Sequence, residues 1–174
     1  MKTAYSEKIS RILKGKNALE KELNVKITIN GKEISIQGET VDEYIAEKVI
    51  TALNFGFPFR TAMLIKEEED YEFEIISIKD FTRSKDLRRV RARIIGSGGK
   101  TLKTMSQLTK CHFELKDNEV GIIGEAVNIK NAQNSMISLI KGTKQANVYS
   151  YLEKHQPEEI IDLGLKPIKK KKKE

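Results

Sequence analysis

Three glycines stand close together in the stretch RIIGSGGKTL, residues 93–102. Glycine lacks a Cβ atom and adopts positive φ without strain, so Gly96, Gly98 and Gly99 let the chain turn sharply and expose backbone N–H groups. N–H groups at the start of a helix bind phosphate oxygens, and Lys100 adds a positive charge at the same place. The sequence therefore predicts a site for the phosphate backbone of a nucleic acid.

Two nucleotide-binding motifs share part of this pattern but fail on spacing. A P-loop ends in Gly-Lys-Thr, as residues 99–101 do, but this chain has Ile94 where the first glycine of that loop must stand. The dinucleotide fingerprint requires a glycine where the chain has Thr101. The pattern that remains is Gly-x-x-Gly, which is the backbone clamp of the KH class of RNA-binding module. A plain glycine turn between two helices is the alternative.

Basic residues crowd the segment just before the glycines. Residues 83–93 hold six arginines and lysines and a single acid, Asp86. A helix here would bury Leu87, Val90 and Ile94 and direct the cations towards the loop, which favours RNA or DNA binding over a merely solvated face. Ile94 and Ile95 could also form part of an apolar floor under the bases. The candidate RNA-binding residues are Arg88, Arg89, Arg91, Arg93, Ile94, Ile95, Gly96, Ser97, Gly98, Gly99 and Lys100.

The net charge of +7 is concentrated in one part of the chain. Residues 1–70 carry 11 basic and 12 acidic side chains, whereas residues 71–156 carry 15 and 9. Only the second part is electrostatically suited to a polyanion.

A duplicated module accounts for most of the chain. Residues 25–29 and 34–36 alternate apolar and polar side chains around an Asn30-Gly31 turn, which predicts a β-hairpin. Before it we expect a short strand in residues 1–5 and two helical stretches separated by Gly15, and after it a helix capped by Thr40 and ending at Gly56. The pattern from Gly38 to Gly56 recurs 86 residues later, from Gly124 to Gly142, which indicates duplication.

The fold expected from this repeat is α/β (α+β), with two copies of one small module. Each would have a three-stranded antiparallel sheet with three helices on one face. The expected division is a degenerate KH domain over 1–57, a linker over 58–71, an RNA-binding KH domain over 72–143, and a C-terminal helix and lysine-rich tail over 144–174. In the first copy, residues 10–13 (Ser-Arg-Ile-Leu) take the place of the glycine loop, so we expect the fold to be repeated without its clamp.

Other chemistries find little support in the residue pattern. Cys111 is the only cysteine, and its neighbour His112 would point to the opposite face of a strand, so no catalytic dyad is expected. We predict no enzyme activity, no cofactor and no metal site. No apolar run has the length of a membrane span, and the first ten residues lack the apolar core of a secretory signal, so we expect a cytoplasmic protein without membrane contact. Residues 148–155 predict a last short helix, followed by the five lysines 169–173.

The second copy also resembles a known family. The stretch RVRARIIGSGGKTLKTMSQLTKCHFELKDNEVGIIGE, with NVYSYLEKH after it, is similar to ribosome-assembly KH proteins of the Krr and "partner of Nob one" type in archaea and eukaryotes. The resemblance implies that the two copies are tandem type I KH domains packed side by side. It also implies binding of single-stranded RNA near the 3′ end of small-subunit (16S) ribosomal RNA by residues 96–100 and the flanking arginines. It further implies the Nob endonuclease and the alpha subunit of translation initiation factor two as partners. The first copy departs from the family because it is short before Ile9 and lacks the clamp glycines.

These observations lead to one principal hypothesis, a monomeric, non-enzymatic RNA-binding factor for assembly of the small ribosomal subunit. The alternative is a general adaptor that links RNA to a translation or maturation factor through its first KH domain. A nucleotide-dependent enzyme using Gly99, Lys100 and Thr101 is the third and least favoured hypothesis.

Overall fold

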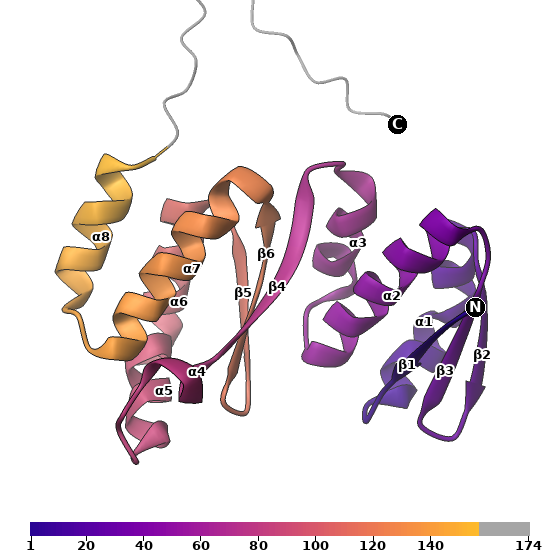
Figure 1. Ribbon diagram of the computed structural model, residues 1–174, viewed down its shortest axis with the longest axis horizontal. Helices are drawn as coiled ribbons and strands as arrows, with labels where there is room; N and C mark the ends of the chain where they lie inside the picture. Colours follow the sequence, from indigo (N-terminus) through magenta and orange to yellow (C-terminus); the bar gives the residue numbers. More distant parts are fainter. Residues whose placement is uncertain (157–174) are drawn as a thin grey trace, which may run out of the picture.

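The protein has a mixed α/β fold, and the computed structural model describes residues 1–156 (Figure 1). The lysines predicted as a basic tail, 169–173, lie outside the described residues. The first half contains β1 (Lys2–Tyr5), α1 (Ile9–Leu23), β2 (Lys26–Asn30), β3 (Glu33–Gln37), α2 (Thr40–Phe55) and α3 (Phe59–Glu67). The second half contains β4 (Tyr71–Ser77), α4 (Ile78–Phe81), α5 (Leu87–Ile95), the 3-10 turn η1 (Ser97–Gly99), α6 (Lys100–Thr109), β5 (His112–Lys116), β6 (Glu119–Glu125), α7 (Ala126–Lys141) and α8 (Gln145–Lys154).

Two three-stranded antiparallel sheets have the same strand order. The first is β1-β3-β2 and the second is β4-β6-β5, so in each sheet the last strand of the hairpin lies in the centre. The predicted hairpin is confirmed, with Ile27 opposite Ile36 and a turn in which Gly31 has a φ of 62°. Positive φ is the conformation that this type of tight turn requires and that glycine supplies without strain.

The 86-residue offset predicted from the sequence is present in the element bounds. Strands β2 and β5 begin and end 86 residues apart, and so do helices α2 and α7. Both helices are preceded by a glutamate, and both end at a glycine with positive φ, Gly56 at 139° and Gly142 at 101°. Local sequence signals thus produce the same structure twice.

The two halves differ most in the segment between the first strand and the helix before the hairpin. In the first half only residues 6–8 connect β1 to α1, whereas residues 78–99 connect β4 to α6 and include α4, α5 and the glycine loop. The predicted break at Gly15 is wrong, because α1 is a single helix from Ile9 to Leu23. Burial of Ile12, Leu19 and Leu23 along one side of α1 outweighs the cost of about 1 kcal/mol for a glycine inside a helix.

The elements stack in layers, as Figure 1 shows: the first sheet, helices α1 and α2, helix α3, the second sheet, and then α6, α7 and α8. Helix α3 was not predicted, since residues 58–71 were expected to form a linker. Its side chains Ala62, Met63 and Ile65 are buried, and α3 packs on α2 and on strands β4 and β6. The helical layer of the first half therefore has α1 and α2 next to the sheet, while α3 covers the second sheet.

Both faces of the second sheet are consequently covered. Val120 and Ile122 on β6 belong to the core under α6 and α7, whereas Ile123 belongs to the core of the first half. Covering both faces accounts for the continuous burial of residues 120–124 and for their apolar sequence VGIIG. The central strand of the second sheet is thus shared by two hydrophobic cores.

Three phenylalanine rings pack against one another where the two halves meet. The ring centroids of Phe55 and Phe57 lie 6.0 and 5.7 Å from that of Phe73 on β4, with edge-to-face geometry in both pairs. A Cβ atom at Gly121 would lie 2.8 Å from the rings of both Phe55 and Phe57, so this strand position has room only for glycine. Aromatic packing of this kind stabilises the junction beyond the area that it buries.

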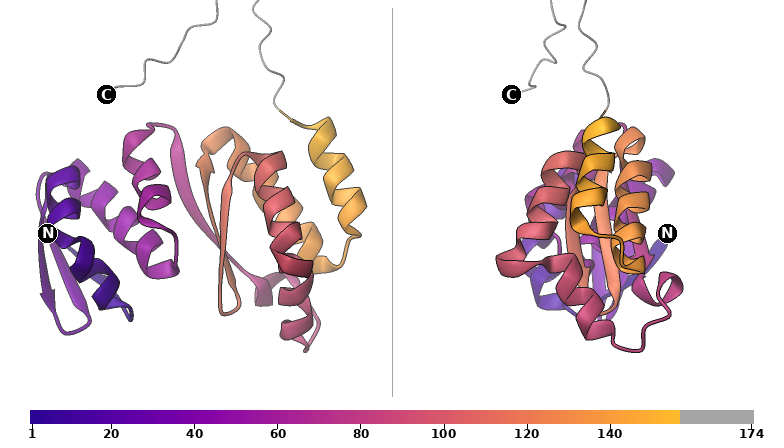
Figure 2. Two further views of the ribbon diagram at one scale, coloured as in Figure 1. Left: turned by 180° about the vertical axis from the view of Figure 1, so that it is seen from behind. Right: turned by 90° about the vertical axis from the view of Figure 1, so that its left-hand side faces the viewer.

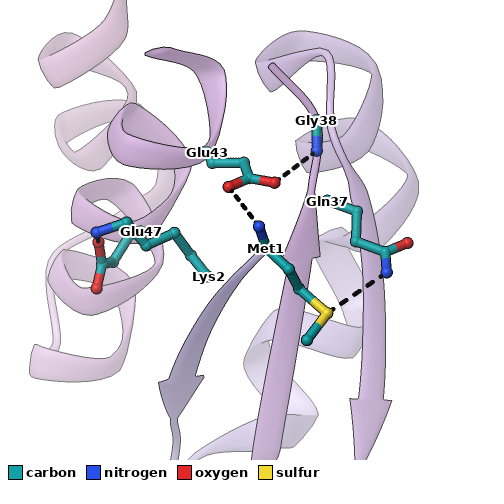
Figure 3. Close-up of polar contacts among 6 residues, drawn as sticks. All are labelled: Met1, Lys2, Gln37, Gly38, Glu43 and Glu47. Carbon is teal, nitrogen blue, oxygen red and sulfur yellow. Dashed lines mark hydrogen bonds and ion pairs between the residues drawn. The ribbon is translucent and has the colours of Figure 1, made fainter. Parts of the chain in front are cut away.

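Polar contacts fix strand β1 and the start of helix α2 to one another (Figure 3). The N-terminal amino group of Met1 lies 2.9 Å from the carboxylate of Glu43, and the Gly38 backbone N–H donates to the same carboxylate over 3.1 Å. Hydrogen bonding to that amino group and to Gly38 lowers the pKa of Glu43. The predicted cap by Thr40 is wrong: Glu39 is the residue before the helix, and its side chain makes no capping bond.

Helix α8 lies against both α6 and α7, as the right-hand view of Figure 2 shows. Its predicted apolar residues Val148 and Leu152 are each 3% exposed and complete the core of the second half. None of the helices formed by residues 1–156 combines the length and the apolar character needed to cross a membrane.

Candidate nucleic-acid interface

The glycine loop between α5 and α6 has the open backbone that a phosphate clamp requires. Gly96, Gly98 and Gly99 have φ values of 74°, 59° and 75°, a region that residues with a Cβ atom adopt only with strain. No heavy atom outside the adjoining residues lies within 4 Å of the positions where Cβ atoms of Gly98 or Gly99 would stand. Ser97 and Lys100 are exposed beside them. A phosphate can therefore approach the backbone of this loop directly.

At Gly96 a side chain is excluded for a different reason, which is a steric clash with Thr101. A Cβ atom built on Gly96 would lie 2.1 Å from the Thr101 Oγ1 atom and 2.8 Å from the Thr101 backbone nitrogen. Thr101 is 3% exposed, and its hydroxyl accepts a 2.9 Å hydrogen bond from the Gln145 Nε2 atom of helix α8. The same amide group donates to the Arg93 backbone oxygen over 3.3 Å. Helix α8 thus holds both ends of the loop.

The four arginines predicted to bind RNA fall into two groups. Helix α5 begins at Leu87, after Asp86 accepts a 3.1 Å hydrogen bond from the Arg89 backbone, so the helix is shorter than the basic segment that predicted it. Arg88 and Arg89 are exposed on its first turn. Arg91 donates to the Asn118 side chain in the β5–β6 turn, and Arg93 donates to the Leu139 backbone oxygen over 3.3 Å. Among residues 1–156, Arg88 and Arg89 have no such partner, whereas Arg91 and Arg93 stabilise the fold.

The two isoleucines before the loop also separate. Ile94 is fully buried and belongs to the core of the second half, so it cannot contact a base. Ile95, the last residue of α5, is 36% exposed and lies directly before the clamp. Of the predicted apolar floor at the loop, only Ile95 is accessible to RNA.

The first half has no equivalent surface. Residues 10–13, which align with the glycine loop, lie in the first turns of helix α1 and contain no glycine, and the Arg11 backbone N–H donates to the Lys8 backbone oxygen over 3.0 Å. Ile12 is 1% exposed and fills the core at the position of Gly98. The matching position in the first half is therefore filled by a side chain and closed to a phosphate.

Cys111 and His112 lie in different environments. Cys111 is 1% exposed, and burial raises the pKa of its thiol to about 11. His112 on strand β5 is exposed, although partial loss of hydration lowers the pKa of its ring. Within residues 1–156, no group of three or more His, Cys, Asp or Glu side chains could hold a metal ion.

The sequence did not predict the role of helix α8 beside the loop. A hollow of about 550 Å³ is lined on one side by Gly96, Ser97, Lys100 and Thr101 and on the other by Gln145 and Tyr149. Gln145 is 44 residues from Thr101 in the chain, and a single glutamine carries no pattern that would link it to the loop. Only the docking of α8 brings the two together.

Comparison with known proteins agrees with this geometry. Residues 72–157 match the PNO1 family model described as a eukaryotic type KH-domain (KH-domain type I). The chain is 29% identical over 148 residues to a KH domain-containing protein of Methanocaldococcus jannaschii, an alignment that covers 81% of this chain and 65% of that protein. It is 32% identical over 136 residues to the RNA-binding protein PNO1 of Oryzias latipes, covering 74% and 56%. The chain thus spans between half and two thirds of the length of these relatives.

Solved structures give the same result. Dim2p of Pyrococcus horikoshii superposes with a TM-score of 0.80 and 26% identity, covering 88% of this chain and 99% of that one. The same archaeon provides a complex of a/eIF2alpha, aDim2p and rRNA, with a TM-score of 0.82, 26% identity, and coverage of 89% and 93%. Because the clamp segment, the fold and these relatives all agree, the chain belongs to the PNO1 and Dim2 family of KH-domain proteins.

Proposed function

We propose that this protein is a non-enzymatic ribosome-assembly factor that binds single-stranded RNA through residues 96–100 of its second half. The observation that carries the proposal is the open loop itself, in which Gly98 and Gly99 have positive φ and free space around them. Exposed Arg88 and Arg89 supply positive charge on the helix that enters the loop. The target is the 3′ end region of small-subunit ribosomal RNA.

The first half is a KH domain that has lost its clamp and retains the fold. Its sheet has the same strand order as that of the second half, and its hairpin strand β2 and helix α2 keep the 86-residue offset. A surface freed from RNA binding is available for a protein partner. By analogy with the P. horikoshii complex, that partner is the alpha subunit of initiation factor two, and the Nob endonuclease is the other candidate. The cytoplasmic location is part of the same proposal.

The decisive experiment places two negative charges on the clamp. The double variant S97D/G98D should abolish binding of a labelled single-stranded RNA from the 3′ end of small-subunit ribosomal RNA, because carboxylates repel the phosphate. The matched control is S10D/L13D, which adds the same charge at exposed helical positions aligned with the loop in the first half. Equal loss of affinity in both variants, or none in S97D/G98D, would refute the clamp.

Competition then tests which RNA is bound. A groove that reads base edges needs unpaired bases, so the unlabelled 3′-end strand should displace the probe better than its own duplex or a scrambled strand. If all three competitors displace the probe equally, the surface holds RNA through charge alone and the ribosomal target is wrong.

A further inference from the structure

We propose that a polar hollow between helices α7 and α8 binds one nucleotide of a single-stranded RNA, at a place separate from the glycine loop. This α7–α8 hollow has a volume of about 340 Å³, and its lining residues come from α7, from α8 and from the turn between them. A volume at the lower end of the range for small-ligand sites fits one nucleotide. The choice of RNA as the occupant rests on the proposed function, whereas binding at this place does not require the clamp.

Helix α8 separates the α7–α8 hollow from the glycine loop. Gln145 and Tyr149 line the hollow beside the loop, whereas Asn147 and Tyr151 line the α7–α8 hollow. Residues two apart in an α-helix point about 200° away from one another, so the two hollows lie on opposite sides of α8. Helices α7 and α8 also form the end of the layered stack that is farthest from the first half (Figure 1). The α7–α8 hollow is therefore a second place on the molecule and not an extension of the clamp.

The internal repeat shows how the α7–α8 hollow arises. Helix α8 begins 86 residues after α3, the offset that also relates α7 to α2, so α8 is the second copy of α3. Three core positions of the first half, each at most 1% exposed, are occupied by hydroxyl-bearing residues in the second half. The matching pairs are Val49 and Ser135, Ala52 and Ser138, and Phe57 and Thr143. The positions that fill an apolar core in one copy line a polar hollow in the other.

Ser135 lies at the floor of the α7–α8 hollow with an unpaired hydroxyl. Its side chain is 2% exposed, and among residues 1–156 its hydroxyl is the one buried side-chain polar group without a hydrogen-bond partner. Ser138 behaves differently, since its hydroxyl donates to the Asn134 backbone oxygen of the same helix over 3.0 Å. An unpaired buried hydroxyl destabilises the free protein, so a ligand that hydrogen-bonds to Ser135 removes this cost.

The remaining walls match the two kinds of surface that a nucleoside presents. Val148 at the floor and Tyr151 at the rim offer apolar surface for the flat face of a base. The Tyr151 ring is held in place by stacking on His155, with ring centroids 4.1 Å apart. The side-chain amides of Asn134 and Asn147 each offer a donor and an acceptor, the pair of groups that the edge of adenine matches.

The charges around the α7–α8 hollow favour a nucleic-acid strand as its occupant. Its lining residues are uncharged, but residues 126–156 carry four lysines and a single acid, Glu153. Lys141, Lys144 and Lys154 are exposed, and each stands three residues from a residue that lines the hollow. Side chains at this spacing on a helix are neighbours, so the lysines can contact phosphates on either side of a bound nucleoside.

A further protein sheet does not fit the same face. In the first half, the rings of Phe55 and Phe57 pack against Phe73 on β4, where the second sheet covers the helical layer. At the positions that match these two phenylalanines, 86 residues later, the second half has Lys141 and Thr143. The apolar pair needed to dock another sheet is thus replaced by a cation and a hydroxyl.

The test isolates the α7–α8 hollow by using the full chain with the clamp variant S97D/G98D. Addition of an oligoadenosine tetramer should shift the backbone amide resonances of residues 134–151. The tetramer should bind about tenfold more tightly than adenosine 5′-monophosphate, because one added phosphate–lysine contact contributes about this factor. Equal affinity for both probes would identify a site for a free nucleotide and overturn the RNA assignment. No shift at residues 134–151 with either probe would overturn the site.

Two substitutions in the same background assign binding to the α7–α8 hollow. T143F introduces the residue of the first half and fills the space, and S135V removes the hydroxyl with little change of shape. Each should weaken tetramer binding about tenfold, and S135V should also raise the thermal midpoint of the free protein by about 2–4 °C. The matched control is S150F, at an exposed position of α8 outside the hollow. Unchanged affinity in both T143F and S135V, or an equal loss in S150F, would overturn the site.

The same measurements keep the two sites apart. If the wild type binds the tetramer and S97D/G98D does not, the α7–α8 hollow is overturned and the clamp stands. If the wild type and S97D/G98D bind equally well and T143F abolishes binding in both, the clamp is refuted and the α7–α8 hollow stands.

Discussion

The Gln145 Nε2 atom of helix α8 donates to the Thr101 Oγ1 atom over 2.9 Å, directly beneath the glycine loop. Because Thr101 is 3% exposed, its hydroxyl cannot turn to solvent if the amide is removed. A buried polar group left without a partner typically costs about 1–3 kcal/mol. The hydrogen bond from helix α8 thus stabilises Thr101, which lies next to the candidate clamp.

Replacing Gln145 by alanine should therefore reduce the free energy of unfolding by about 1–2 kcal/mol. In a double-mutant cycle with Thr101→Val, the two changes should be non-additive by about 1 kcal/mol, since each removes the same hydrogen bond. Chemical denaturation of the four proteins measures this coupling. Additive effects would show that the contact contributes nothing to stability.

The loop glycines should respond unequally to alanine. Gly96→Ala introduces a Cβ atom 2.1 Å from Thr101 Oγ1 in addition to backbone strain, whereas Gly98→Ala introduces strain alone, because the space around Gly98 is open. A non-glycine residue with positive φ costs about 1–2 kcal/mol, so Gly98→Ala should lose about that amount and Gly96→Ala clearly more. Thermal unfolding compares the two variants, and equal losses would contradict the packing described at Gly96.

The glycine loop, the hairpin and the glycines that end α2 and α7 could be predicted because their signals are local. Glycine supplies positive φ at positions 31, 96, 98 and 99 whatever surrounds it, and the alternation of residues 25–29 indicates a strand by itself. The repeat was visible for the same reason, since a glutamate precedes and a glycine follows both α2 and α7.

Long-range contacts could not be predicted. Arg91 and Arg93 look like free cations in the sequence, but their partners Asn118 and Leu139 lie 27 and 46 residues away. Helix α3 was hidden by the acidic residues 67–70 at its end, and its buried side chains are explained by packing on α2 and on the second sheet. Likewise, Phe57 and Thr61 lie beside Leu102 and Phe113 only because the two halves stack.

Gly15 offers a stabilising substitution. It lies inside helix α1, has no positive φ, and a Cβ atom there would make an ordinary contact of 3.7 Å with the Phe59 ring. Alanine is favoured over glycine within a helix by about 1 kcal/mol, so Gly15→Ala should raise the free energy of unfolding by about that amount. RNA affinity should not change, because the site lies in the other half. Lower stability of Gly15→Ala would mean that the Phe59 contact is tighter than described.

Cys111 should react slowly with thiol reagents while the protein is folded. Its side chain is 1% exposed, and burial raises the pKa of the thiol from 9.0 to about 11, so little thiolate exists at pH 8. The folded state keeps this proton to a higher pH than the unfolded state. Stability should therefore fall as pH rises from about 9 towards 11, and Cys111→Ala should lack this component. Rapid modification in native buffer at pH 8 would contradict the buried position.

The final prediction separates arginines that bind RNA from arginines that support the fold. Arg88 and Arg89 are exposed, whereas Arg93 donates to the Leu139 backbone oxygen. Each phosphate contact contributes about 0.7 to the slope of log affinity against log salt concentration on single-stranded RNA. The double variant R88A/R89A should therefore reduce the slope by about 1.4 and leave the free energy of unfolding within about 0.5 kcal/mol of wild type.

Arg93→Ala should lower the stability without changing the salt dependence, because the substitution removes the hydrogen bond to the Leu139 backbone oxygen and no phosphate contact. We expect a loss of stability of about 1 kcal/mol with an unchanged salt slope. The control for total charge is K14A/K21A, which removes two exposed cations from the first half. If K14A/K21A lowers the slope as much as R88A/R89A does, RNA binding depends only on the net charge of the protein, and the arginines of helix α5 make no specific phosphate contacts. If R88A/R89A alone lowers the slope, the strand crosses the first turn of α5 on its way to the glycine loop.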